Sequence, residues 1–187
     1  GFKVERIISE PTAAAIAYGL YDKKKDTRFL VFDLGGGTFD VSILELFDNI
    51  LEVRAVAGDN YLGGEDFTEL LERWFISEKK LDVNTLDRKT LAHIHKQAEQ
   101  CKIKLSDSKE AVMRCKIGED YEEASITYAQ YEKECEPLLD RIRKPVQRSL
   151  SDAHIKLSDI DVVVLVGGGT KFQIVRDFIV RLFKKFP

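Results

Sequence analysis

Two segments of this chain have nearly the same sequence, and they restrict the fold more than any other feature. The first is Val31–Asp40 (VFDLGGGTFD) and the second is Val164–Thr170 (VLVGGGT). In each segment an apolar run, typical of a strand buried on both faces, leads into three glycines and a threonine. We therefore expect an α/β fold in which two buried strands each end in a glycine turn.

Consecutive glycines at the end of a strand suit phosphate oxygens, because successive backbone N–H groups converge on one point with no Cβ in the way. Thr38 adds a hydroxyl donor to the first run. A carboxylate at the end of the same strand, here Asp33, suits a hydrated Mg²⁺. A single glycine run more often indicates only a flexible turn. Two runs, the first flanked by Asp33 and Asp40, favour a site for a nucleotide polyphosphate.

The periodicity of apolar residues predicts the other elements. Helices are expected over residues 12–18, 67–75, 91–105 and 131–142 and from about 172 onward, and strands over 29–32, 39–43, 50–57, 111–117, 123–127 and 162–166. The apolar residues Val4, Ile7 and Ile8 also have the character of a strand. The charged run Asp22–Asp26 is typical of a solvated turn.

One of these helices carries two local signals. Thr127 and Gln130 have the form of a capping box, which starts a helix. Pro137 lies within the following apolar stripe, although proline lacks the N–H that a helix needs and its ring clashes with the preceding turn. We expect the helix to begin after Thr127 and to kink or break at Pro137.

The composition limits the classes of partner. Basic and acidic residues are mixed and the formal net charge is −3, so the chain lacks the basic surface that binds a phosphate backbone. The longest aliphatic run, Val162–Val166, is far shorter than the roughly 20 residues that cross a bilayer. The widely spaced Cys101, Cys115 and Cys135 favour buried apolar thiols over a disulfide framework or a zinc site. We expect a soluble cytoplasmic protein with no nucleic-acid or membrane partner.

Four motifs together carry a family resemblance. They are EPTAAAIAYGL at residues 10–20, FDLGGGTFDV at 32–41, LGGEDF at 62–67 and LVGGGT at 165–170. In their order and spacing they resemble the signatures of DnaK-type heat-shock chaperones, over essentially the whole chain. The resemblance implies an actin-like, ribonuclease H-like ATPase lobe with a mixed β-sheet and flanking helices. It also implies a smaller α/β subdomain, expected at 64–135, inserted into a lobe core formed by 1–63 and 136–187.

The resemblance also implies a set of residues for ATP or ADP. On the phosphate side these are Gly35, Gly36, Gly37 and Thr38, with Asp33 organising Mg²⁺ through water, Glu10 near the hydrolytic water, and Asp40 near the metal or the phosphate. Glu10 has a simpler interpretation as a carboxylate that favours a helix N-terminus.

On the nucleoside side the matching residues are Glu99, Lys102 and Ser106, whose spacing places them on one face of a helix. Without the resemblance, this face would be read as a solvated helix edge. Across from them, the residues expected to close on the ribose and α-phosphate are Gly167, Gly168, Gly169, Thr170 and Lys171.

This chain departs from the family pattern near the base. Ile103 and Lys171 stand where many members have Arg. The planar guanidinium of Arg stacks on adenine, whereas Lys stacks poorly and Ile cannot stack in this way. Gly169 stands where a serine or another side chain is usual. We therefore expect adenine binding to be weaker or to rest on other contacts.

The resemblance implies partners as well. The chain opens without Met and closes at Pro187, so we expect a piece of a longer protein, with an opposing lobe that completes the ATP site. The longer protein is expected to hold and release unfolded polypeptide, assisted by J-domain and nucleotide-exchange co-chaperones. One alternative is a weakly hydrolysing module that docks an exchange partner. A sugar kinase or filament protein is a further alternative, but it does not explain the EPTAAAIAYGL and LGGEDF motifs.

Overall fold

A four-stranded mixed sheet forms the centre of the protein. The computed structural model describes residues 1, 3–19, 26–48 and 50–184. The strands of this sheet are β1 (Thr27–Leu34), β2 (Phe39–Phe47), β3 (Ile50–Asp59) and β6 (Val162–Val166), in the order β3-β2-β1-β6. β1 pairs antiparallel with β2 and parallel with β6, and β2 pairs antiparallel with β3. The sheet is therefore mixed, as expected for an actin-like lobe.

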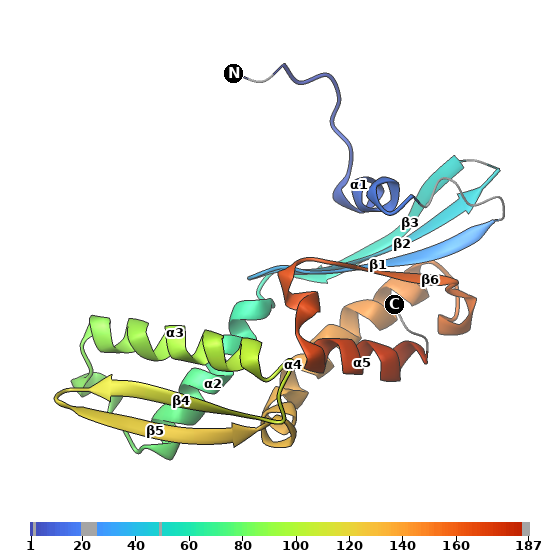
Figure 1. Cartoon of the computed structure of the whole chain (residues 1–187). Coiled ribbons are helices and arrows are strands. Elements are labelled where there is room, and N and C mark those ends of the chain that lie inside the picture. Colours follow the sequence, from blue (N-terminus) through green and yellow to red (C-terminus); the bar gives the residue numbers. More distant parts are fainter. Residues whose placement is uncertain (2, 20–25, 49, 185–187) are drawn as a thin grey trace.

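Helices lie on both faces of this sheet (Figure 1). The helices are α1 (Glu10–Ala17), α2 (Gly64–Glu78), α3 (Arg88–Lys104), α4 (Tyr128–Asp152) and α5 (Gln173–Phe183), with short 3₁₀ turns at Val83–Thr85, Leu157–Asp159 and Gly168–Lys171. α1 packs on one face, where Ala15 is buried against Phe29, Val31 and Val164. α4 and α5 cover the other face.

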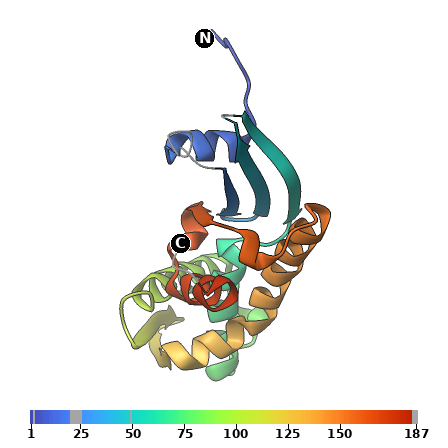
Figure 2. The ribbon, with the colours of Figure 1, turned by 90° about the vertical axis from the view of Figure 1, so that its right-hand side faces the viewer.

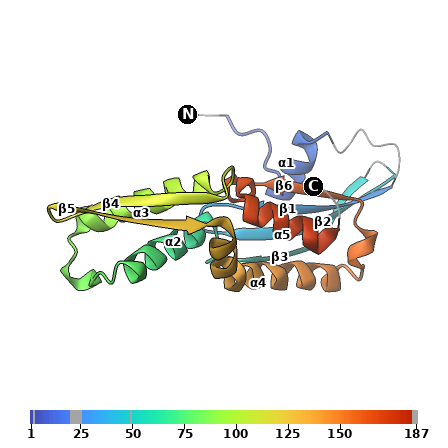
Figure 3. The same cartoon turned by 60° about the horizontal axis from the view of Figure 1, so that its bottom comes forward.

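A second group of elements extends past one end of the sheet (Figure 3). It contains α2, α3 and the antiparallel hairpin of β4 (Glu110–Ile117) and β5 (Asp120–Thr127). β4 alternates buried and exposed residues, which is the pattern of a strand with one face on a core. Gly118, with φ +64°, occupies the left-handed position of the tight turn.

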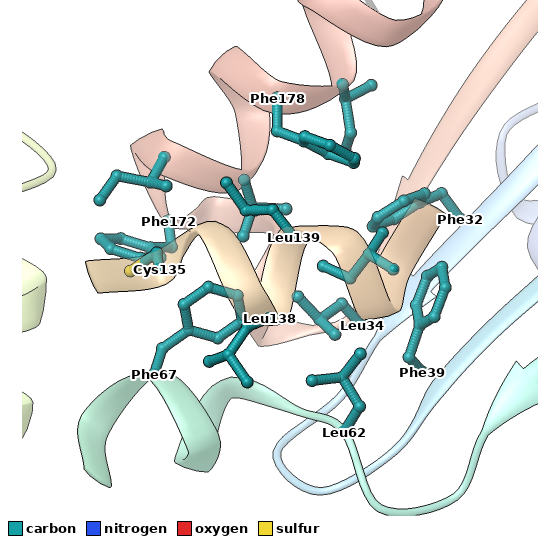
Figure 4. Packing of buried hydrophobic residues seen from close by; sticks show 14 of the residues in the cluster. Phe32, Leu34, Phe39, Leu62, Phe67, Cys135, Leu138, Leu139, Phe172 and Phe178 are labelled. Atoms are coloured by element: carbon teal, nitrogen blue, oxygen red, sulfur yellow. The ribbon is translucent and has the colours of Figure 1, made fainter. Parts of the chain in front are cut away.

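One apolar core joins the two parts. Phe32, Leu34 and Phe39 from the sheet end and Phe67 and Phe172 from outside the sheet belong to the same buried cluster, with α4 passing between them (Figure 4). Leu138 and Leu139 of α4 belong to the same cluster. The core therefore fixes α2 and the start of α5 against the ends of β1 and β2.

The expected start of α4 is confirmed, and Pro137 has a milder effect than a break. The Thr127 hydroxyl accepts from the Gln130 N–H at 3.2 Å, and the Gln130 side chain accepts from the Thr127 N–H at 2.9 Å. The helix continues through Pro137 to Asp152, and its axis bends along the way (Figure 2). A second proline, Pro145, lies inside the same helix, and the buried residues around both prolines hold the helix together because their packing outweighs the lost hydrogen bonds.

One expected strand is wrong. Val4, Ile7 and Ile8 form no strand and are 72, 89 and 50% exposed. An apolar run becomes a strand only when a neighbouring strand accepts its hydrogen bonds, and this segment pairs with none of the described strands. The turn expected at Asp22–Asp26 falls largely on residues 20–25, which lie outside the described residues.

Two further expectations about the chain have outcomes in the structure. Cys101, Cys115 and Cys135 are all free and buried, as expected of small apolar residues. Within the described ranges, no helix combines the length and the apolar character that crossing a membrane requires. The division at residues 64–135 stays a prediction, and α4 runs across its second boundary.

Tyr131 links α4 to α2 in the core, and this link gives a prediction about stability. Its ring is fully buried and its hydroxyl donates to the Phe67 carbonyl. Tyr131→Phe should lower the free energy of unfolding by about 1 kcal/mol, the usual value of one buried hydrogen bond. Urea unfolding measures this. Tyr121→Phe, on a ring that is 60% exposed, is the control and should be neutral; equal effects would contradict the role of the Tyr131 hydroxyl.

Candidate functional site

The two glycine turns lie side by side because β1 and β6 are parallel neighbours. Asp33 is paired with Val166, so both strands end at the same edge of the sheet. The backbones are in close approach there: a Cβ on Gly167 would lie 2.3 Å from the Leu34 carbonyl oxygen and 2.7 Å from Asp33 Oδ1. Gly167 also has φ +86°, which L-residues rarely adopt. Only glycine lets the second turn come this near to the first.

The start of α2 holds the first glycine turn in place. The Gly64 N–H donates to the Gly35 carbonyl and the Glu65 N–H to the Gly36 carbonyl, both at 2.8 Å. A Cβ on Gly63 would lie 2.2 Å from the Gly36 oxygen, so this approach also requires glycine. The Gly35 and Gly36 carbonyl groups are thereby satisfied by α2. The LGGEDF motif thus shapes the turn that follows β1.

A cleft of about 550 Å³ lies where these turns meet α3. It is lined by Gly35, Gly36, Gly64, Glu65, Phe67, Glu99, Lys102, Ile103, Ser106, Asp107, Gly168, Gly169, Lys171 and Phe172. Eight of the residues expected from the sequence are among them, drawn from both glycine turns and from the α3 face. The structure therefore brings together side chains that lie far apart along the chain.

Lys102 is the central cation of the cleft. Its ammonium group donates to the Gly64 carbonyl at 2.9 Å and to the Thr68 hydroxyl at 2.6 Å. Burial lowers the pKa of Lys102, and the nearby carboxylates of Glu65 and Glu99 oppose this shift. Both hydrogen-bond partners are neutral, so the positive charge of Lys102 is offset only by these two nearby carboxylates, and an anionic or strongly polar ligand would compete with them for it.

The turn that follows α3 is joined to the start of α5. Ser106 lies just past the end of α3 at Lys104, outside the helix on which it was expected, and its hydroxyl accepts from the Gln173 N–H at 3.4 Å. Ile103, on the same helix, lines the cleft with 60% of its surface exposed. This wall of the cleft therefore presents an apolar side chain at the position where many family members have an arginine.

Three carboxylates gather beside the first glycine turn, outside the cleft walls. Asp33 and Asp40 are direct partners across β1 and β2. Burial raises the pKa of Asp33 to about 6, helped by the charge of Glu10, a hydrogen bond with Glu10 and the charge of Asp40. Burial and then the charge of Glu10 raise the pKa of Asp40. The carboxylates repel one another, which is the environment that a divalent cation would relieve.

The donor set fits a metal only through water. No group of three His, Cys, Asp or Glu side chains in the described ranges is arranged to hold a metal ion directly. Carboxylates beside an exposed turn suit Mg²⁺, because this ion keeps several of its waters. The glycine turns fit phosphate: a Cβ on Gly36, Gly37 or Gly168 would meet nothing within 4 Å, so a ligand can approach their backbone.

Some of the expected residues do not line the cleft. Thr38 and Gly37 are exposed on the first turn and Gly167 on the second, next to the cleft. Thr170 is buried, and its hydroxyl donates to the Gly167 carbonyl at 2.8 Å. Its side chain therefore stabilises the second turn and is not free to bind a ligand in this arrangement.

Sequence reasoning missed several lining residues. Glu65 and Gly64 belong to the LGGEDF motif, which served only for the resemblance, and their position at a helix start beside Gly63 was an available signal. Phe67, Asp107 and Phe172 also line the cleft. Phe67 is the last residue of the LGGEDF motif. No local pattern indicates Asp107 and Phe172, because they reach the cleft only through the packing of α3 and α5.

Comparisons with known proteins agree with this geometry. The family described as Hsp70 protein matches residues 1–187. The chain is 42% identical over 196 residues to the "Heat shock 70 kDa protein 6, chloroplastic" of Arabidopsis thaliana. It is 41% identical over 196 residues to the chaperone protein dnaK of Guillardia theta, and 43% over 197 residues to the chaperone protein DnaK of Thermosipho africanus. Each match covers 100% of this chain but 27, 31 and 33% of the respective relative, so the chain spans about a third of their length.

The contact between Gly63 and the first turn gives a second prediction. Gly63→Ala should lower the free energy of unfolding by about 2 kcal/mol or more, because its methyl group would overlap the Gly36 carbonyl and push α2 away. Urea unfolding measures the loss. Gly37→Ala, in open space on the same turn, is the control for stability and should change it little. A stable Gly63→Ala protein would show that the turn is not held as described.

The raised pKa of Asp33 gives a third prediction. The folded protein binds a proton at Asp33 more tightly than the unfolded chain, whose carboxyl has a pKa near 3.8, so stability falls as the pH rises from about 4 to about 6. Asp33→Asn removes this loss and should stabilise the protein more at pH 7 than at pH 4, as measured by urea unfolding. Asp26→Asn, at an exposed carboxyl, is the control. If Asp33→Asn gives no larger gain than this control, the surroundings of Asp33 do not disfavour its charged form.

Proposed function

We propose, because this chain belongs to the Hsp70 protein family, that it is the nucleotide-binding lobe of an ATP-dependent chaperone. The observation that carries the proposal is the single cleft lined by both glycine turns and by α3. Its volume of about 550 Å³ lies within the range of small-molecule and cofactor sites. The proposed ligand is ATP or ADP with Mg²⁺.

The glycine turns would hold the phosphates. The open backbone at Gly36 and Gly37, with the exposed Thr38 hydroxyl beside it, supports contacts to the β- and γ-phosphates. Gly168 and Gly169 on the second turn would approach the ribose and α-phosphate. Lys171, exposed at the mouth of the cleft, would add a positive charge there.

The α3 face would hold the nucleoside. Glu99 and Lys102 of α3 and Ser106 just after it line one wall of the cleft, and they would contact the ribose hydroxyls and the base. The exposed Ile103 offers an apolar surface to a base, without the stacking that a guanidinium provides. We therefore infer that adenine is held less tightly here than in family members with arginine at this position.

Hydrolysis in the complete site would depend on position and charge. Phosphoryl transfer of this type relies on electrostatic stabilisation rather than covalent chemistry. Bound Mg²⁺ would neutralise charge on the phosphate oxygens. Asp33 would hold the hydrated ion through water, and with a pKa of about 6 it is mainly ionised at neutral pH. Glu10 would orient the attacking water, and Asp40 would add charge to the same group.

The complete protein is proposed to do more than this chain can. Since the chain spans about a third of its relatives, an opposing lobe would close over the nucleotide. Residues 64–135 would act as an inserted subdomain on the lobe core of 1–63 and 136–187. The complete protein would couple ATP hydrolysis to binding and release of unfolded polypeptide, with J-domain and exchange co-chaperones, and we propose the cytoplasm as its compartment.

Nucleotide titration of this chain tests the proposal. We expect residues 1–187 to bind Mg-ATP weakly, with a dissociation constant above the micromolar range and little hydrolysis, since one lobe supplies only part of the site. Lys102→Ala should weaken binding about tenfold, which corresponds to one charged hydrogen bond. Lys104→Ala, exposed on the same helix, is the matched control and should bind normally. No binding at millimolar ATP, or equal binding by Lys102→Ala, would contradict the proposal.

A further inference from the structure

His95 lies between two carboxylates of a neighbouring helix. It is on α3, and its Nδ1 is 3.1 Å from Glu72 Oε2 while its Nε2 is 3.3 Å from Glu65 Oε2, both on α2. The side chains of His95, Glu72 and Glu65 are 41, 22 and 55% exposed. Each ring nitrogen of one histidine therefore faces its own carboxylate.

Both carboxylates can accept a hydrogen bond from His95 in only one protonation state of its ring. A neutral imidazole has one N–H donor and one acceptor lone pair, whereas an imidazolium has two donors. With His95 neutral, one of the two carboxylates faces the lone pair of a ring nitrogen and receives no hydrogen bond from it. With His95 protonated, both nitrogens donate and α2 is tied to α3 at two points. Histidine is the side chain whose charge ordinarily changes near neutral pH.

Glu65 connects His95 to the cleft. Its side chain lines the cleft and its N–H donates to the Gly36 carbonyl of the first glycine turn at 2.8 Å. Its negative charge also acts on the Lys102 ammonium, where it favours the charged form. If the Glu65 side chain moves, or if a positive charge neutralises its carboxylate, the electrostatic potential at the proposed phosphate and nucleoside contacts therefore changes.

The other charges near His95 are already paired or lie further along the helices. On α2, Glu69 is bound by Arg73 at 2.7 Å. On α3, Glu99 lies one turn beyond His95 and acts on Lys102. β4 packs on α3 with buried apolar residues, and its charged side chains line a separate groove with other α3 residues: Arg114 and Lys116 with Lys89, His93 and Lys96. Glu65 and Glu72 are thus the charges in direct contact with His95.

We propose that His95 is a positioning residue that couples proton uptake to nucleotide binding, by holding Glu65 against α3 when its ring is protonated. The inference rests on the proposed function, because it concerns the same cleft. Protonated His95 compensates the charge of Glu65, which otherwise repels the phosphates of an incoming nucleotide. Anionic nucleotides should then bind more tightly at lower pH. A unit charge about 10 Å away in a largely aqueous environment changes affinity about twofold.

The test compares ADP affinity at about pH 6.5 and about pH 8 in three proteins. Affinity is measured by NMR from the shift of the Ser106 amide as ADP is added without Mg²⁺. For unmodified protein, binding should strengthen toward pH 6.5 by about twofold more than for His95→Gln. His93→Gln, two residues away in the separate groove, is the matched control and should keep the full pH dependence. Ionisation of ADP and of Asp33 is common to all three proteins and cancels in the comparison.

Each outcome bears on a distinct claim. If ADP binds and His95→Gln shows the same pH dependence as unmodified protein, the inference is wrong and the proposed function stands. The inference is also wrong if His93→Gln loses the pH dependence to the same extent. Absence of binding by the unmodified protein at both pH values, to ADP and to Mg-ATP alike, would overturn the proposed function and with it the inference. Glu72→Gln, which leaves His95 one carboxylate, should also reduce the pH dependence and serves as the second variant if His95→Gln does not fold.

Discussion

The parallel pairing of β1 with β6 is the contact on which the rest of the site depends. Because Asp33 is paired with Val166, two glycine turns from opposite ends of the chain meet at one edge of the sheet. Their backbones approach so closely that Gly167 has no room for a Cβ. A shift of one residue between these strands would move one turn away from the other and bring Asp33 to the opposite face. Strand pairing thus sets the position of every proposed phosphate contact.

The second part of the molecule completes the cleft through a few specific contacts. Gly64 and Glu65 hold the first turn with backbone hydrogen bonds, and Lys102 of α3 bonds back to the Gly64 carbonyl. The first turn, α2 and α3 are therefore one connected unit, and the apolar core around Phe67 and Phe172 keeps that unit against the sheet. This connection explains how a change on α3, such as protonation of His95, can reach the cleft without any large motion.

Much of the fold could be predicted because it follows from local patterns: apolar runs for β1 and β6, helical stripes, and the capping box at Thr127. The strand expected at Val4–Ile8 was wrong because pairing depends on a neighbour, which no local pattern supplies. The α3 and glycine-turn residues of the cleft were predicted from the resemblance, and the structure brings most of them together. The LGGEDF motif held an available signal for Glu65. The close approach of Gly63 to the first turn and the pairing of His95 could not be predicted, since they arise from contacts between elements distant in sequence.

The central claim is that the two glycine turns and α3 act together as one nucleotide site. Chemical-shift mapping of the backbone amides of residues 1–187 during addition of ADP tests it most directly. The account predicts that the amides of Gly36, Gly168 and Ser106 shift together and follow one binding curve. Shifts confined to a single one of these three segments, or found only in the groove between α3 and β4, would contradict it.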